Sequence, residues 1–316
     1  MTLRRFSRRL IAGLLLTLAA APMRAASKVP PFNPMPNSFV QNAAAPLNIN
    51  QKHTFITADT ALLRPAVGAL RRVLKERTGM DIALCRQGAK GSITLAIDTA
   101  LHGAEHYRLA VSKKGLAITG ATPAAVFLGV MTLNQLLLAD PHEAELGHIP
   151  AVKIDDAPRF SLRALMIDPA RNFLPVKDVK RFIEVMAKYK YNALQLHLTD
   201  DQGWRISLKS YPQLASPQSY SAADIREIVA YAAEHYIDVI RELDIHGPTA
   251  AFLSVYPELG CTHLQNAPIK VGETVNRMLC AANDTVYTVY NQILREVAEL
   301  FPSQYIHLGG DEAAVP

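Results

Sequence analysis

The 316-residue sequence has few of the residues on which several common kinds of site are built. It contains three cysteines and one tryptophan, and it has neither a Cys-x-x-Cys pair nor a His-Glu-x-x-His pair. A zinc site therefore has little support. The glycine-rich motifs of dinucleotide-binding and phosphate-binding loops are also absent, so nucleotide chemistry is not favoured either.

The sequence also lacks an excess of one charge outside its first residues. Residues 1–26 hold five arginines and no acidic residue, whereas the rest of the chain has 28 basic and 28 acidic side chains. A neutral body argues against a nucleic-acid partner, which needs a clustered basic face. With 49% apolar and 19% charged residues the composition is that of a folded chain, and its length suggests about two domains.

One apolar run stands out, at the N-terminus. Arginines at positions 4 to 9 precede the apolar residues 10–21, and Ala25 and Ala26 offer a cleavage site. Because the run is too short to span a bilayer, we predict a signal peptide over residues 1–26. The mature protein is then exported, periplasmic or secreted, and has no membrane segment. The other interpretation of the run is an uncleaved amphipathic anchor.

The cysteines allow one disulfide. Cys261 and Cys280 are close in sequence and flank a loop-like segment, so they form a plausible pair in an oxidising compartment. Cys85 is then a lone thiol that behaves as a small apolar group.

Residues 48–155 have the mixed pattern of an α+β domain. They follow residues 27–47, which are rich in proline and asparagine and are predicted to be a linker. The predicted strands are residues 53–57, 92–97, 107–111 and 116–119, and the predicted helices are residues 60–77 and 122–138. No convergent set of reactive side chains falls in this part, so it is predicted to be a scaffold.

Residues 156–316 change to an alternation of strands and helices. The predicted strands are residues 161–168, 192–198, 237–243 and 304–308, and the predicted helices are residues 176–189, 221–235 and 284–301. This order implies right-handed βαβ units and a parallel sheet. Acids or histidine follow each strand: Asp168; His197, Asp200 and Asp201; Asp244 and His246; Asp311 and Glu312. Because strand carboxyl ends build the catalytic face of a (β/α) barrel, we favour a barrel over an open doubly wound sheet.

The run His307-Leu-Gly-Gly-Asp311-Glu312 is the strongest candidate for chemistry. Two adjacent carboxyls directly after a buried strand raise each other's pKa, and the glycines let the backbone turn tightly. An acid held protonated beside an ionised partner is what glycosidic cleavage requires. The plain alternative is a solvated turn.

The second half of the chain resembles glycoside hydrolase family 20, the exported β-N-acetylhexosaminidases. The matching stretches are residues 163–171, 190–192, 197–205, 256–261 and 307–312, and residues 105–138 resemble the small α+β domain that precedes the barrel in that family. The resemblance implies a (β/α)8-type barrel, of which about the first four β/α units are expected in residues 156–316.

The family resemblance implies a retaining, substrate-assisted mechanism that needs no cofactor. It implies exo-action on an oligosaccharide or glycoconjugate that ends in N-acetylglucosamine or N-acetylgalactosamine. Glu312 matches the general acid/base, Asp311 the residue that orients the substrate's acetamido group, and Arg163 the residue that grips the sugar hydroxyls. The other implied substrate-binding residues are Asp200, Asp201, Trp204, Asp244 and His307. A core position is equally consistent with Trp204.

Two features depart from the family pattern. Pro248 stands where the family has histidine, and His246 stands where proline is usual, which alters the hydrogen bonding offered to the catalytic acid. A full barrel takes about 250 residues, but only 161 residues run from Asp156 to Pro316. We therefore expect this polypeptide alone to be weakly active or inactive.

Two alternatives to a glycosidase stay open at this point. One is a non-catalytic sugar-binding or interaction remnant of such an enzyme. The other is an unrelated barrel hydrolase with a metal on His197, Asp200 and Asp201, although these residues have no established ligand spacing.

Overall fold

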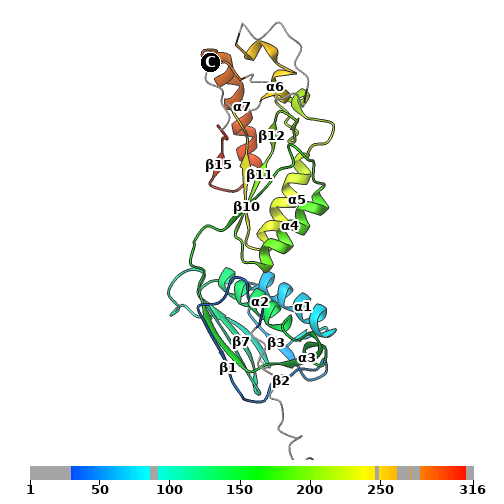
Figure 1. Ribbon diagram of the computed structural model, residues 1–316, viewed down its shortest axis with the longest axis vertical. Coiled ribbons are helices and arrows are strands. Elements are labelled where there is room, and N and C mark those ends of the chain that lie inside the picture. Colours follow the sequence, from blue (N-terminus) through cyan, green and yellow to red (C-terminus); the bar gives the residue numbers. More distant parts are fainter. Residues whose placement is uncertain (1–29, 86–91, 246–248, 262–270, 272–277, 311–316) are drawn as a thin grey trace, which may run out of the picture.

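The computed structural model describes residues 30–85, 92–245, 249–261, 271 and 278–310, which form two units along its long axis (Figure 1). An α+β unit comes first and a β/α unit follows. The predicted signal peptide, His246, Pro248, Asp311 and Glu312 lie outside the described residues. No helix within these ranges is both long and apolar enough to cross a membrane.

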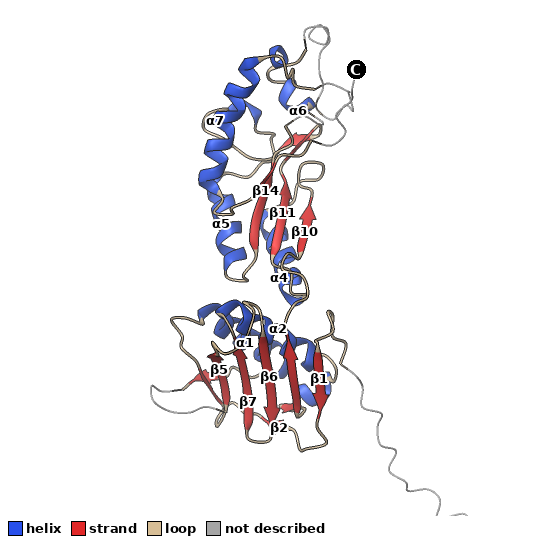
Figure 2. Cartoon of the chain, turned by 90° about the vertical axis from the view of Figure 1, so that its left-hand side faces the viewer, coloured by secondary structure: helices blue, strands red, loops and turns tan. Residues whose placement is uncertain are grey.

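The first unit is built on a seven-stranded sheet with strand order β1-β9-β6-β7-β5-β3-β4. The strands are β1 (Ser38–Gln41), β3 (Phe55–Thr57), β4 (Ala83–Leu84), β5 (Ile93–Ile97), β6 (Tyr107–Ser112), β7 (Gly115–Gly120) and β9 (Val152–Asp156). Helices α1 (Arg64–Thr78) and α2 (Pro123–Leu137) lie on one face of the sheet (Figure 2). The strands predicted over residues 107–111 and 116–119 are confirmed as β6 and β7, which form an antiparallel hairpin.

Helix α2 is the centre of this unit's core. The Thr122 side chain accepts a hydrogen bond from Ala125 N at 3.2 Å, and Pro123 starts the first turn. Every residue from Ala125 to Leu137 is buried, because the helix contacts the sheet, α1 and the second unit. Its continuous apolar character follows from this position between layers.

The N-terminal segment differs from the prediction. Residues 38–41, expected in a linker, form edge strand β1, which pairs antiparallel with β9. A shorter pairing joins β2 (Leu47–Asn48) to β8 (His148–Ile149), next to helix α3 (Pro141–Glu145). Strand β1 has no buried residue, and its sequence therefore lacks an alternating apolar pattern. It forms a strand because it hydrogen-bonds to β9, more than 100 residues later in the chain.

The second unit contains the predicted parallel sheet, in the order β10-β11-β14-β15. The strands are β10 (Ala164–Ile167), β11 (Ala193–His197), β14 (Asp238–Glu242) and β15 (Ile306–His307), and the long helices are α4 (Val176–Lys188), α5 (Ala222–Ala233) and α7 (Asp284–Leu300). Shorter elements are β12 (Thr199–Asp200), β13 (Gly203–Trp204), α6 (Ala250–Leu253) and the 3-10 turns η1 (Pro212–Leu214) and η2 (Pro257–Leu259). In the described residues this sheet is open, with β10 and β15 at its edges.

A buried polar network joins the two units. The Lys190 ammonium lies 2.9 Å from Asp156 Oδ2 and donates to the Tyr107 hydroxyl at 2.7 Å. Burial raises the pKa of Asp156, but the Lys190 charge and the Tyr107 hydrogen bond outweigh it and hold the pKa below its usual value. This junction fixes the amino ends of the parallel strands, so their carboxyl ends point away from the first unit (Figure 2).

Candidate active site

Polar side chains meet at the carboxyl ends of the parallel strands. His197 ends β11, Glu242 ends β14 and His307 ends β15, and the strand register places them in one row. Gln195 precedes His197 by two residues and therefore shares its face of the sheet. Leu194, Leu196 and Val239 on the opposite face are buried, so the polar row belongs to the face that the helices leave uncovered (Figure 2).

His197 is buried between two carboxylates. Its Nε2 lies 2.9 Å from Asp200 Oδ2, and its Nδ1 lies 3.0 Å from Glu242 Oε1. Burial lowers the pKa of His197, but the hydrogen bonds and charges of Asp200 and Glu242 outweigh it and raise the pKa to about 10. His197 is therefore a cation at neutral pH and ties the ends of β11 and β14 together.

Glu242 is the acceptor at the middle of the row. Gln195 Nε2 donates to Glu242 Oε2 at 2.5 Å, and His307 Nδ1 lies 3.3 Å from Oε1. Burial raises the pKa of Glu242, whereas the bonds from His197 and Gln195 lower it, and the net pKa is below the ordinary value. Glu242 therefore stays ionised and acts as a fixed anion rather than a proton donor.

Arg171 is the exposed cation of this edge. Its guanidinium lies 2.7 Å from Asp168 Oδ2 and 2.9 Å from Asp200 Oδ2, and 43% of its side chain is accessible to solvent. Asp168 also accepts the Arg171 backbone N–H at 2.9 Å. A guanidinium held by two carboxylates but open to solvent is suited to bind neighbouring hydroxyls of a ligand.

A second arginine fixes the loop that carries Arg171. The buried Arg205 guanidinium donates to Pro169 O at 2.9 Å, to Ala170 O at 2.9 Å and to Gln218 O at 3.0 Å. A Cβ on Gly203 would lie 2.5 Å from this guanidinium, so glycine makes room for it. Arg205 therefore holds the β10–α4 loop in place from behind.

Asp201 is a buried carboxyl next to two other acids. It accepts the Ala250 N–H at the start of α6 at 2.7 Å. Burial raises the pKa of Asp201, the Ala250 bond opposes it, and the charges of Asp200 and Asp244 raise it further, so the net pKa is above the usual value. This side chain holds α6 against the strand ends.

Asp244 holds the turn that follows β15. It accepts the Gly310 N–H at 3.0 Å, and a Cβ on Gly309 would lie 2.2 Å from its Oδ1. Gly309 and Gly310 have φ values of +63° and +100°, which favour glycine. The sequence prediction of a tight turn is therefore confirmed, and the turn leads directly into Asp311 and Glu312.

The structure does not bring Arg163 to this edge. Arg163 precedes β10 at the amino end of the strand, where its guanidinium pairs with Glu105 of the first unit at 2.6 and 2.8 Å. It also donates to the carbonyls of Phe160 and Lys190. Because these bonds engage all three guanidinium nitrogens, the position of Arg163 argues against the sugar contact that the resemblance implied.

Trp204 also lies away from solvent. It is 1% exposed and packs on Phe252 of α6, with the ring centroids 5.7 Å apart. Of the two sequence interpretations, the structure places this side chain in the core. The remaining implied binding residues, Asp200, Asp201, Asp244 and His307, all come together at the strand ends.

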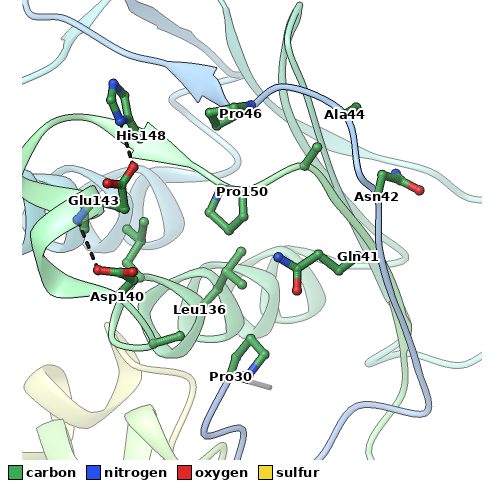
Figure 3. Close-up of a pocket in the computed structure, with 14 residues that line it drawn as sticks. Pro30, Gln41, Asn42, Ala44, Pro46, Leu136, Asp140, Glu143, His148 and Pro150 are labelled. Carbon is green, nitrogen blue, oxygen red and sulfur yellow. Dashed lines mark hydrogen bonds and ion pairs between the residues drawn. The ribbon is translucent and has the colours of Figure 1, made fainter. Parts of the chain in front are cut away.

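A cavity of about 480 Å³ lies in the first unit, between residues 41–46 and the segment from α2 to β8 (Figure 3). Its ionisable side chains serve local structure: Asp140 caps α3, and Glu143 pairs with His148 at 2.8 Å. The cavity therefore offers no catalytic group beyond these. A second cavity of about 300 Å³ lies between Ile245 and α7, and its lining is mainly apolar.

Sequence reasoning assigned no role to Glu242 or Arg171. Glu242 is the last residue of β14, one residue before the predicted end of the strand. It shares a strand face with Ile240, and this period of two was the signal that could have placed Glu242 on the polar face. Arg171 lies within a matching stretch, three residues after the strand-end acid Asp168. Arg163 lies at the amino end of β10, whereas Arg171 follows its carboxyl end. Active sites of this kind of sheet lie at the carboxyl ends of the strands, so strand direction favours Arg171.

Two family models match nearly the whole described chain. Residues 30–157 match glycosyl hydrolase family 20, domain 2, and residues 160–316 match the catalytic domain of the same family. The chain belongs to glycosyl hydrolase family 20. The two units of the structure correspond to these two domains.

Relatives in the family carry hexosaminidase names. The β-hexosaminidase of Porphyromonas gingivalis is 34% identical over 282 residues, which are 82% of this chain and 36% of the relative. The β-N-acetylhexosaminidase of Cellulomonas fimi is 31% identical over 281 residues, which are 82% of this chain and 55% of the relative. The chain thus spans about a third to a half of these relatives.

Solved structures of the family show the same arrangement. Streptomyces plicatus N-acetyl-β-hexosaminidase in complex with Thio-NAglucal has a TM-score of 0.81 and 34% identity, covering 93% of this chain and 61% of that one. A mutant of the Streptomyces plicatus enzyme in complex with the product GlcNAc also has a TM-score of 0.81, covering 89% and 59%. These structures indicate a small domain followed by a TIM-barrel-like catalytic domain.

Proposed function

We propose that this chain carries the catalytic residues of an exo-acting β-N-acetylhexosaminidase, which removes a terminal N-acetylglucosamine or N-acetylgalactosamine. The observation that carries the proposal is the Gly309–Gly310 turn, held by Asp244 at the carboxyl edge of the sheet directly before Asp311 and Glu312. The Streptomyces plicatus relative in complex with GlcNAc supports the sugar class.

The proposed reaction is retaining and substrate-assisted. The carbonyl oxygen of the substrate's acetamido group attacks the anomeric carbon while the glycosidic C–O bond breaks, and Glu312 gives a proton to the leaving oxygen. Asp311 orients the acetamido group and stabilises the charge on its nitrogen. Water then attacks the anomeric carbon, Glu312 takes its proton, and the cyclic intermediate opens to the free sugar.

Arg171 is the residue we propose to bind the sugar hydroxyls, in place of Arg163. It lies on the same edge as Asp244 and His307, and Asp168 and Asp200 orient its guanidinium. In the proposed closed barrel, strands β10, β11, β14 and β15 are one arc, and their uncovered polar face turns toward the barrel axis.

Turnover of a chromogenic N-acetylglucosaminide by the full chain tests the catalytic roles. The chain alone is expected to turn over slowly, and Glu312→Gln is expected to lower that rate by roughly 100-fold or more, as loss of a general acid does, with an unchanged unfolding midpoint. Equal turnover by both proteins would contradict the assignment of Glu312.

Binding of N-acetylglucosamine-thiazoline, a mimic of the cyclised intermediate, tests the site without turnover. We expect Arg171→Ala to weaken binding at least tenfold. The matched control is Arg181→Ala, because Arg181 lies on α4 with 77% of its side chain exposed. Failure of the unaltered chain to bind, or equal weakening by both variants, would contradict the proposed site.

We also propose that residues 1–26 are removed on export, because the arginine-rich start and short apolar run have the form of a signal peptide. The N-terminal sequence of the protein recovered from the periplasm or medium tests this. A mature chain that begins near Ser27 is expected, and a chain that keeps Met1 and stays with the membrane fraction contradicts it.

A further inference from the structure

The two cysteines of the second unit lie next to each other where the chain enters α7. Gly260 and Leu279 form an antiparallel bridge, and Cys280 N donates to Leu259 O at 2.9 Å. Cys261 and Cys280 directly follow these bridge residues. In this antiparallel pair Cys280 lies opposite Leu259, so Cys261 is its diagonal neighbour on the same face. The side-chain hydrogen bond from Cys280 raises the pKa of Cys261, with burial a smaller cause.

The backbone on both sides of this contact is fixed. Leu259 and Leu279 are each 3% exposed. Asn283, the N-cap of α7, donates its backbone N–H to Cys280 O at 2.9 Å and its side-chain amide to Glu258 O at 3.3 Å. The two thiols are therefore held close by a frame that does not depend on a bond between them.

The third cysteine is well separated from this pair. Cys85 follows β4 in the first unit, where its N–H donates to Ile56 O and its sulfur accepts the Thr57 hydroxyl at 3.5 Å. All three cysteines are free thiols with intermediate exposure, so an oxidant in solution reaches each of them. Because Cys85 belongs to the other unit, only one intramolecular pairing is available.

We propose that Cys261 and Cys280 are oxidised to a disulfide that stabilises the folded chain. The chemistry is exchange with a small disulfide such as oxidised glutathione. The thiolate of one cysteine attacks the oxidant and releases one reduced glutathione. The second thiolate then attacks the mixed disulfide and releases another, so that two protons and two electrons leave the pair for each S–S bond formed.

The disulfide ties the base of α7 to the end of η2. Helix α6, just before η2, packs on α7 through Phe252 and Tyr290, whose rings are stacked with centroids 5.4 Å apart. The first residue of α6 is the one that donates to Asp201. The crosslink therefore restrains the element that holds Asp201 at the strand ends, and its formation does not depend on catalytic activity.

Thiol counting by mass spectrometry tests the pairing. The folded full chain is equilibrated with oxidised and reduced glutathione, denatured in N-ethylmaleimide and weighed intact. We expect one maleimide per chain, on Cys85, together with a peptide that links Cys261 to Cys280. After reduction we expect three. Three maleimides without reduction, stable glutathione adducts or a link to Cys85 would overturn the proposal.

Serine variants provide matched controls. Cys280→Ser is expected to take two maleimides, and Cys85→Ser none until it is reduced. In thermal unfolding, reductant is expected to lower the midpoint of the oxidised chain by about 5–10 °C and to leave the Cys261→Ser/Cys280→Ser variant unchanged. An equal response of both proteins to reductant would overturn the stabilising role.

Discussion

His197 shows how a single residue connects two strands of the site. It lies in a row of buried groups with Asp200 on one side and Glu242 on the other, at 2.9 and 3.0 Å. Two buried carboxylates this close to each other require a cation between them, because neither can be left unpaired at low cost. The structure therefore uses the histidine as a charge that is present throughout the neutral range rather than as a proton shuttle.

We predict that His197→Gln destabilises the chain by about 3 kcal/mol at pH 7, as the loss of one partner from a buried ion pair does. Urea unfolding followed by circular dichroism measures this. The matched control is His307→Gln in the same row, with half its side chain exposed and an expected effect of about 0–1 kcal/mol. Equal effects of the two variants would contradict the role of His197.

The stability difference between the unaltered chain and His197→Gln is predicted to depend on pH. The pKa of His197 is raised from 6.5 to about 10, so its stabilising contribution is complete below pH 6.5 and is lost as the pH rises toward 10. The stability gap between the unaltered chain and His197→Gln should therefore narrow between pH 6.5 and 10. Measurements above pH 6 avoid Glu242, whose lowered pKa places its titration on the acid side of 4.5.

At the scale of elements, short turns rather than helices fix the candidate site. Strand β15 has two residues, and the glycine turn after it is held by Asp244, which follows the neighbouring strand β14. Likewise, the loop after β10 is held from behind by Arg205. The long helices supply the apolar layer that supports the sheet, and the loops position the polar groups, as expected for strand-end sites.

We predict that Gly309→Ala distorts this turn more than Gly310→Ala does. Both glycines have positive φ, so each substitution brings backbone strain of about 1 kcal/mol or more. Only the Cβ at 309 also meets the Asp244 carboxylate, at 2.2 Å, whereas no atom lies within 4 Å of a Cβ at 310. Urea unfolding should show a larger loss of stability for Gly309→Ala, and a larger effect of Gly310→Ala would contradict this account of the turn.

In the molecule as a whole, two ion pairs join the two units, one buried and one exposed to solvent. Lys190 and Asp156 are almost completely buried, with side-chain exposures of 1% and 6%. Arg64 of α1 and Glu234 after α5 also meet across the junction, but their side chains are 71% and 42% exposed. Since solvent screens the second pair, the buried pair should dominate the coupling between the units.

We predict that Lys190→Met destabilises the chain by about 3–5 kcal/mol, because Asp156 would remain buried without its cation. The control Arg64→Met removes the exposed cation at the same junction and should change stability by about 0–1 kcal/mol. Calorimetry measures both, and a separate unfolding step for each unit in Lys190→Met would show the lost coupling directly. Equal melting temperatures of the two variants would contradict the dominant role of the Lys190–Asp156 pair in coupling the units.

Patterns in the amino-acid sequence were sufficient to predict the local elements of this protein. Apolar spacing predicted the long helices and the parallel strands, and the helix predicted over residues 221–235 is found as α5, with Ser221 as its N-cap. Acids after each strand indicated the edge where the polar groups meet. These features depend on residues close together in the chain, which is why a pattern could reveal them.

Contacts between distant segments select the polar residues that lie at the candidate site. Arg163 and Arg171 flank the same strand, β10. Glu105 of the first unit engages Arg163 at the amino end, and Asp200 of β12 orients Arg171. Strand β1 likewise exists because β9 pairs with it. Each of these outcomes depends on a partner between 29 and 117 residues away, and chain-local patterns do not encode such pairings.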